Sequence, residues 1–123
     1  MDRGKKVIVF GGSGFLGSHV ADSLTKRGFG VTIFDIKESS YLQETQSMIV
    51  GDILDQDQID NALMGHDIIY NFAGISDIND CHEHPLETIK YNILGNAQIL
   101  ESAVKNNIKR YLFASSAYVY SAS

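Results

Sequence analysis

Three glycines, each separated by two residues, stand where the first predicted strand meets the first predicted helix. The apolar run at 7–10 leads into GGSGFLGSH. Glycines at this spacing let the backbone turn tightly, approach a pyrophosphate closely and pack a helix against a strand. The free amides at the start of the helix then face the phosphates, so that even an acidic protein can hold a polyanion. The candidate phosphate-binding residues are Gly11, Gly14, Phe15, Leu16 and Gly17.

An acidic residue ends the second apolar run. Asp35 lies in FDIK, eighteen residues after Gly17, where a carboxylate can accept both hydroxyls of an adenosine ribose. A 2′-phosphate at 4 Å from this carboxylate would cost about 4 kcal/mol at an effective dielectric constant of 20, before screening. The sequence therefore favours NAD over NADP, with Asp35 and the adjacent Ile36 as cofactor-binding candidates.

Other interpretations of the glycine turn are weaker. The glycines could mark only a tight turn, with Asp35 capping the next segment of the chain, but the preceding strand and the downstream acid both fit the dinucleotide fingerprint. A Walker-type loop is excluded because no lysine followed by serine or threonine closes the glycine run. A nucleophile elbow is excluded because Ser13, in GGSGF, lacks the flanking glycine spacing.

Short apolar runs alternate with helical patterns along the whole chain. Such an alternation requires right-handed crossovers and a parallel sheet covered on both faces. We therefore expect an α/β fold, a Rossmann-type doubly wound parallel sheet of five strands in the order 3-2-1-4-5, forming one domain over residues 1–123. Strands are expected at 7–10, 31–34, 48–50, 67–72 and 110–114, and helices at 14–27, 55–65 and 85–106. The segment 37–47 is expected to be a loop, with a short helix within it left open.

Local signals support the helices. Gly28 supplies a left-handed cap for the first, and Gly65 ends the second. Asp55 is expected to cap the second helix while Gln58 reaches back toward its start. Pro85 suits the first position of the third helix. Its apolar residues recur at steps of three and four, at Leu86, Ile89, Ile93, Ala97, Leu100 and Val104.

Composition excludes several classes of protein. With 123 residues and 44% hydrophobic content, the chain can bury one core. No run approaches the roughly 20 apolar residues of a membrane span. The net charge of −5 indicates no basic surface for binding nucleic acid. A single cysteine, Cys81, and the absence of a signal-peptide pattern favour the cytoplasm. We expect no metal, because Cys81, His82 and His84 have no second cluster to complete a zinc site.

Six motifs together resemble one family. GGSGFLGSH, FDIK, GDILD at 51–55, NFAG at 71–74, YNILGN at 91–96 and FASSAYVYS at 113–121 look like the NAD-dependent epimerase/dehydratase family, the extended branch of the short-chain dehydrogenases. Within it the chain is most similar to UDP-glucose 4-epimerase-like members. The resemblance implies NAD as cofactor, a nucleotide-sugar substrate and a homo-oligomer for the intact enzyme.

The resemblance also implies roles for individual residues. Asp52 and Ile53 would flank the adenine, and Phe72, Ala73 and Gly74 would lie close to the cofactor at the end of strand four. Asn92 would brace the loop after strand four or the nicotinamide side. Ser115 would contact the cofactor, and Ser116 would be catalytic, hydrogen-bonding the substrate oxygen. Each position also has a structural alternative, such as a helix cap, a packed strand end, a buried amide or a turn.

One element of the family's chemistry is missing from these 123 residues. The catalytic tyrosine should precede a lysine by four residues, which helps lower its pKa for proton removal. None of the six tyrosines has such a lysine within the chain. We therefore expect the N-terminal portion of a longer enzyme, without turnover. A non-catalytic dinucleotide-sensing module and a fragment too incomplete to bind a ligand stay open. Ser76 and Ser121 depart from the family pattern, so no particular sugar is assigned.

Overall fold

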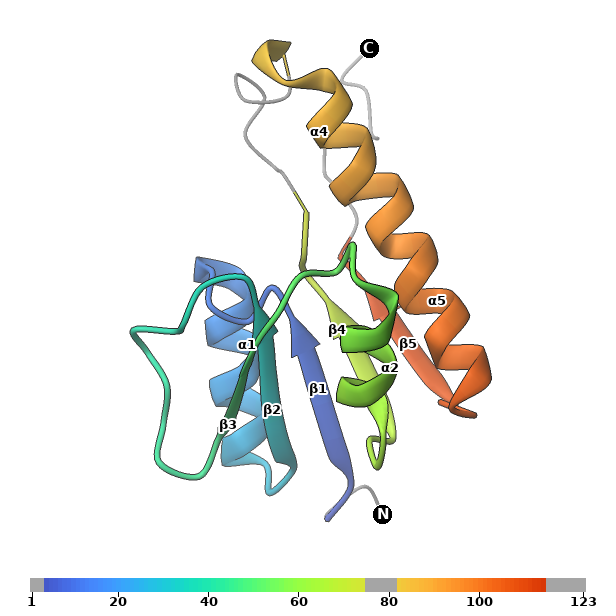
Figure 1. Ribbon diagram of the computed structural model, residues 1–123. Coiled ribbons are helices and arrows are strands. Elements are labelled where there is room, and N and C mark those ends of the chain that lie inside the picture. Colours follow the sequence, from blue (N-terminus) through green and yellow to red (C-terminus); the bar gives the residue numbers. More distant parts are fainter. Residues whose placement is uncertain (1–3, 75–81, 115–123) are drawn as a thin grey trace, which may run out of the picture.

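A computed structural model describes residues 4–74 and 82–114 of the chain, and within them five parallel strands form one sheet. The strand order is β3-β2-β1-β4-β5, as predicted from the sequence. Every strand has its carboxyl end at the same edge, the upper edge in Figure 1. The strands are β1 (Lys6–Phe10), β2 (Gly30–Asp35), β3 (Ser47–Val50), β4 (Ile68–Asn71) and β5 (Arg110–Phe113).

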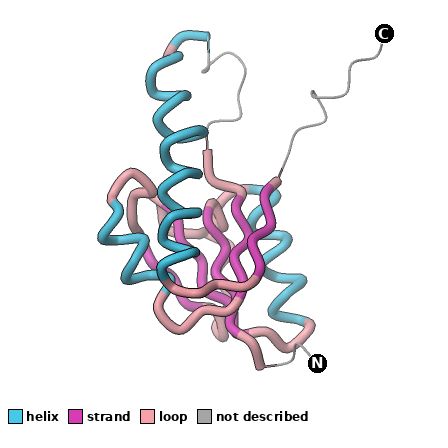
Figure 2. The backbone as a smooth tube through the Cα atoms, turned by 90° about the vertical axis from the view of Figure 1, so that its right-hand side faces the viewer, coloured by secondary structure: helices cyan, strands magenta, loops and turns pink. Residues whose placement is uncertain are grey.

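Helices cover both faces of the sheet, which gives the three layers seen edge-on in Figure 2. One face packs against α1, and the other packs against α2 and α5. A long helix, formed by α4, a π-helical turn and α5, extends well beyond the carboxyl ends of the strands (Figure 1). The helical segments are α1 (Phe15–Lys26), α2 (Gln56–Leu63), α4 (Pro85–Ile89), the π-turn η1 (Lys90–Leu94) and α5 (Gly95–Lys105).

The central strand β1 explains why the chain needs both layers. Four consecutive apolar residues of β1 are fully buried, and alternate side chains of a strand point to opposite faces. Ile8 and Phe10 join the core under α2 and α5, where the Phe10 ring lies 4.8 Å from that of Phe34. Val7 and Val9 join the core under α1. A strand with apolar side chains on both faces is stable only when helices cover both faces of the sheet.

A polar network joins the two helices of the larger core. The hydroxyl of Ser102, which is fully buried, donates to Asp60 Oδ1, and Lys105 Nζ donates to Asp60 Oδ2 at 3.1 Å. These hydrogen bonds lower the pKa of Asp60. Gln56 Nε2 donates to the Ser102 hydroxyl. It also donates to the carbonyl oxygen of Gln98, at 3.0 Å. The network ties α2 to α5 and fixes where the long helix leaves the sheet.

The apolar residues that predict the long helix lie on its solvent side. The residues of α5 that pack inward are Gly95, Ile99, Ser102 and Ala103. A Cβ on Gly95 would overlap the side chain of Ile53, so glycine at this position allows the close packing seen here. Small inward residues let α5 lie close to α2 and to the loop before it, which the hydrophobic periodicity did not reveal. The exposed residues are Leu86, Ile89, Ile93, Ala97, Leu100 and Val104.

The helix-end signals are mostly confirmed. Asp55 Oδ1 accepts hydrogen bonds from the amides of Asp57 and Gln58, at 3.1 and 3.2 Å, and so caps α2. Gln58 does not reach back to Asp55 as predicted. Its Oε1 accepts instead from the amide of Asp52, at 2.7 Å, just beyond β3. Gly28 adopts a left-handed conformation after α1, as predicted.

Strands β3 and β5 form the two edges of the described sheet. Their side chains are partly or fully exposed, including Leu112 and Phe113 of β5. The segment between β2 and β3 contains no helix, in agreement with the predicted loop. Across the described parts of the chain, no helix is both long enough and apolar enough to cross a lipid bilayer.

His66 links folding stability to pH. It precedes β4, and its Nε2 lies 2.9 Å from the hydroxyl of Thr32 in β2. Burial lowers the pKa of His66 below the ordinary value of 6.5. Below about pH 6.5 the unfolded chain therefore binds more protons at this site than the folded chain, so the free energy of unfolding should fall as the pH falls.

We expect His66→Gln, which keeps a polar side chain beside Thr32, to show a shallower loss of stability between about pH 7.5 and 5 than the parent chain. Urea denaturation at several pH values measures this slope directly. Equal slopes for the two proteins would show that His66 does not titrate differently in the folded and unfolded states.

Candidate functional site

The glycine turn lies at the carboxyl end of β1, where the strand order reverses between β1 and β4. Open parallel sheets bind ligands at such a switch point. Gly11 has a φ of 76°, and its amide donates to the carbonyl oxygen of Phe34 at 2.8 Å. On the other side, the amide of Phe72 donates to the carbonyl oxygen of Phe10, also at 2.8 Å. The turn is therefore held between the ends of β2 and β4.

The glycines of the turn have different steric roles. A Cβ on Gly11 would lie 2.6 Å from the carbonyl carbon of Phe72, and a Cβ on Gly17 would collide with the carbonyl oxygen of Gly11. A Cβ on Gly14 would meet nothing closer than that same oxygen, at 3.5 Å, an ordinary contact. Gly12, which the motif did not single out, is also required, because a Cβ there would lie 2.7 Å from Cγ2 of Ile33. The space beside Gly14 is thus open.

The start of α1 is available to a ligand. No side chain caps it, and Ser18 is the first residue whose amide donates within the helix, to Gly14 at 2.9 Å. The preceding amides, those of Phe15, Leu16 and Gly17, have no partner within the helix. The side chains of Phe15 and Leu16 are exposed. The helix start therefore presents free donors and its positive dipole end.

Asp35 is joined directly to the turn. Its Oδ2 accepts from the amide of Ser13 at 3.0 Å, and its Oδ1 accepts from the amide of Lys37 at 3.3 Å. The Ser13 hydroxyl donates to the carbonyl oxygen of Lys37 at 2.7 Å, so the loop after β2 is tied to the glycine turn. Each carboxylate oxygen keeps a lone pair for a further donor. The predicted acid and the predicted turn thus meet, beside an exposed Ile36.

A buried asparagine organises the end of β4. The side chain of Asn71 is only 1% exposed. Its Nδ2 donates to the hydroxyl of Tyr111 at 2.8 Å and to Oδ1 of Asn96 at 3.1 Å, and its Oδ1 accepts from the amide of Ala73 at 2.9 Å. The Tyr111 hydroxyl also donates to Asn96. The sequence motifs did not single out the role of Asn71, although an asparagine in an otherwise apolar strand was a usable signal.

Gly74 and Asn92 lie against each other. A Cβ on Gly74, which has a φ of 136°, would stand 2.5 Å from Oδ1 of Asn92. Position 74 therefore accepts only glycine while Asn92 keeps this place. The contact ties the long helix to the end of β4.

Two residues that were predicted for the site pack in the core. The side chain of Ile53 is buried against Gly95, so it packs in the core under α5. The ring of Phe72 stacks on that of Tyr70 at 6.4 Å and packs on the α1 face. Asp52, adjacent to Ile53, is only partly buried, and its Oδ1 accepts from the amide of Leu54 at 2.9 Å.

Some predicted residues lie outside the described part of the chain. These are the catalytic candidate Ser116, its neighbour Ser115, and Cys81 of the cluster considered for a metal. Within residues 4–74 and 82–114, no three potential ligand side chains gather into a group that could hold a metal ion.

The strand order and the glycine turn at the switch point define a Rossmann-type fold. The chain belongs to the NAD dependent epimerase/dehydratase family, whose sequence model matches residues 7–123. The family resemblance of the six motifs is thereby confirmed.

Curated relatives and solved structures agree with this assignment. The chain is 35% identical over 122 residues to a UDP-N-acetyl-alpha-D-glucosaminuronate decarboxylase of Bacillus cytotoxicus, covering 94% of this chain and 38% of that protein. It is 31% identical over 126 residues to a UDP-glucose 4-epimerase of Yersinia enterocolitica, covering 93% and 38%. A crystal structure of UDP-glucose-4-epimerase from Stenotrophomonas maltophila, with bound NAD and formylated UDP-arabinopyranose, superposes with a TM-score of 0.88 at 26% identity, covering 94% and 38%. The chain thus spans little more than a third of the length of these relatives.

The Asn71 network yields a stability prediction. We expect Asn71→Ala to lower the free energy of unfolding by about 2–4 kcal/mol, because it leaves the part-buried amide of Ala73 without its acceptor and removes the hydrogen bonds that Asn71 donates to Tyr111 and Asn96. Asn61→Ala, at an exposed position of α2, is the matched control and should cost less than about 0.5 kcal/mol. Denaturant titration measures both; a similar loss for the two variants would contradict the role given to Asn71.

Proposed function

We propose that this chain is the NAD(H)-binding portion of a nucleotide-sugar epimerase or dehydratase that works by hydride transfer. One observation carries the proposal: the hydrogen bond from the Ser13 amide to Asp35 joins an open, glycine-lined helix start to a carboxylate at the neighbouring strand end. A dinucleotide needs these two features side by side, because its pyrophosphate and its adenosine ribose are adjacent groups.

Each end of the adenosine diphosphate has a matching group in the chain. The amides of Phe15, Leu16 and Gly17 would donate to the pyrophosphate, which approaches closely because Gly14 has no side chain. The remaining lone pairs of Asp35 would accept the two ribose hydroxyls. A 2′-phosphate in that position would face the carboxylate at a cost of about 4 kcal/mol at 4 Å, before screening. We therefore propose NAD as the cofactor.

The strand ends on either side of the glycine turn would take the base and the nicotinamide half. Asp52 stands at the end of β3, where its carboxylate suits the exocyclic amine of adenine. Ala73 and Gly74, held by Asn71 and Asn92, would let the cofactor lie close to the backbone after β4. When bound, NAD supplies a reversible hydride acceptor. The residues of the chain then bind and orient the cofactor.

The substrate proposal comes from the relatives. The Yersinia and Stenotrophomonas proteins are UDP-glucose 4-epimerases, and the Bacillus protein is a decarboxylase of a UDP-sugar acid. We propose a nucleotide sugar for the whole enzyme, with Ser116 hydrogen-bonding the reacting sugar oxygen. Because no tyrosine in the 123 residues precedes a lysine by four, we propose that these residues bind cofactor without turnover.

Calorimetric titration with NAD and NADP tests the cofactor proposal. We expect the purified, folded chain to bind NAD more than about tenfold more tightly than NADP, because of the charge of Asp35. Tighter binding of NADP would contradict the role of Asp35. Absence of heat with both ligands would contradict the proposed function and favour a chain too incomplete to hold a dinucleotide. Conversion of a nucleotide sugar well above background would contradict the absence of turnover.

The glycine turn offers a matched pair of variants. We expect Gly14→Ala to change the free energy of unfolding by less than about 1 kcal/mol, yet to weaken NAD binding by more than about tenfold, because the new methyl group occupies the pyrophosphate space. Gly17→Ala should instead lower the free energy of unfolding by more than about 2 kcal/mol, because its methyl group collides with backbone.

Thermal melting and calorimetry of both variants separate the two effects. If Gly14→Ala bound NAD as tightly as the parent chain, no phosphate would approach the backbone at Gly14, and the proposed site would be wrong.

A further inference from the structure

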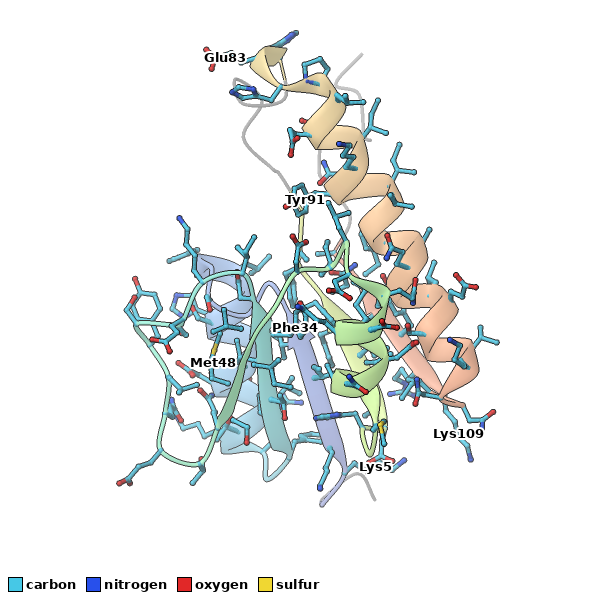
Figure 3. All side chains as sticks on the ribbon, viewed as in Figure 1. Lys5, Phe34, Met48, Glu83, Tyr91 and Lys109 are labelled. Atoms are coloured by element: carbon cyan, nitrogen blue, oxygen red, sulfur yellow. The ribbon has the colours of Figure 1, made fainter. Side chains whose placement is uncertain are left out.

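The long helix contains a π-helical turn directly beside the candidate site. Residues Lys90–Leu94 form this turn, and π-turns within helices are frequent at functional sites. Its successive residues Tyr91 and Asn92 both meet residues at strand ends: Tyr91 meets Asp52 after β3, and Asn92 meets Gly74 after β4. Figure 3 shows Tyr91 reaching from the helix toward the space above the carboxyl ends of the strands.

Tyr91 and Leu54 each donate to one oxygen of the Asp52 carboxylate. The Tyr91 hydroxyl donates to Oδ2 of Asp52 at 3.4 Å, while the amide of Leu54 donates to Oδ1 at 2.9 Å. The amide of Asp52 in turn donates to Oε1 of Gln58 at 2.7 Å. The Tyr91 side chain is partly buried and packs against the larger core, so its hydroxyl is itself anchored.

The protonation state of Tyr91 suits this role. Burial, and next the negative charge of Asp52, raise the pKa of the Tyr91 hydroxyl above its ordinary value of 10.0. At neutral pH the phenol therefore keeps its proton and acts as a donor. Each oxygen of Asp52 accepts one hydrogen bond from the protein and keeps a lone pair for a ligand.

We propose that Tyr91 is a positioning residue for base recognition: its hydroxyl fixes the Asp52 carboxylate so that the free lone pairs accept the exocyclic amine of an aminopurine. The inference rests on the proposed function, in which Asp52 lies beside adenine. It adds that the chain selects an amino-substituted purine dinucleotide over one with hypoxanthine, whose oxygen at the same position would face the carboxylate. Tyr91 acts through Asp52.

Two ligands and two variants test this role. Calorimetry with NAD and with nicotinamide hypoxanthine dinucleotide, which differ at that purine substituent, measures base discrimination. We expect the parent chain to bind NAD more tightly. Tyr91→Phe should weaken NAD binding by about threefold to tenfold and leave binding of the hypoxanthine ligand within about twofold, so that the affinity ratio falls.

Tyr70→Phe is the matched control, because it removes a tyrosine hydroxyl on the opposite, α1 face of the sheet. Its affinity ratio should equal that of the parent chain, and thermal melting shows whether both variants are folded. If Tyr91→Phe weakened both ligands equally, its role would be structural and the inference wrong.

The proposed function and this inference fail in different ways. If the parent chain bound NAD and Tyr91→Phe kept the same affinity ratio, only the inference would be overturned. The same holds if the parent chain bound both dinucleotides equally well. If the folded parent chain bound neither, the proposed function would be overturned together with the inference.

Discussion

The close packing of backbone around Gly11 is the constraint on which the rest of this structure depends. Its amide is bonded to the end of β2, a Cβ on it would overlap the backbone after β4, and its carbonyl oxygen lies where only a glycine at position 17 can fit. Three elements distant in sequence thus meet at one residue. In the described part of the chain, the atoms that a Cβ on Gly11 would meet are all backbone atoms, so this meeting point is formed by backbone.

This contact couples the fold to the candidate site. Because α1 starts against Gly11, its uncapped amides lie at the switch point of the sheet. Because the loop after β2 is bonded to Ser13, Asp35 is held beside the same amides. On the other side, Asn71 and Asn92 hold the backbone after β4. Binding groups on rigid, mutually bonded elements lose little conformational freedom when a ligand arrives.

The features predicted correctly from the sequence are those with local signals. The alternation of apolar runs with helical patterns predicted the strand order. The glycine spacing and Asp35 predicted a turn and a carboxylate that meet in the folded chain. The partners of Asn71 could not be predicted, because Asn96 and Tyr111 are 25 and 40 residues away in the sequence. Gly12 is required by the side chain of Ile33, which only the folded chain places there.

The long helix shows a second limit of sequence patterns. Periodicity correctly predicted a helix, but it did not tell which face meets the sheet. The inward face uses small residues around Ile99, while the stripe including Ile93 and Val104 is exposed. The π-turn also escaped prediction, because one extra residue in a turn leaves the apolar spacing nearly unchanged.

The most direct test of the central claim is an NMR titration of the ¹⁵N-labelled chain with NAD, following each backbone amide. If the glycine turn binds the pyrophosphate, the largest shifts should occur at Phe15, Leu16 and Gly17, whereas the amides of Asp57 and Gln58, already capped by Asp55, should move little. Unchanged amides at the start of α1, in a chain that nonetheless binds NAD, would contradict pyrophosphate binding at the glycine turn.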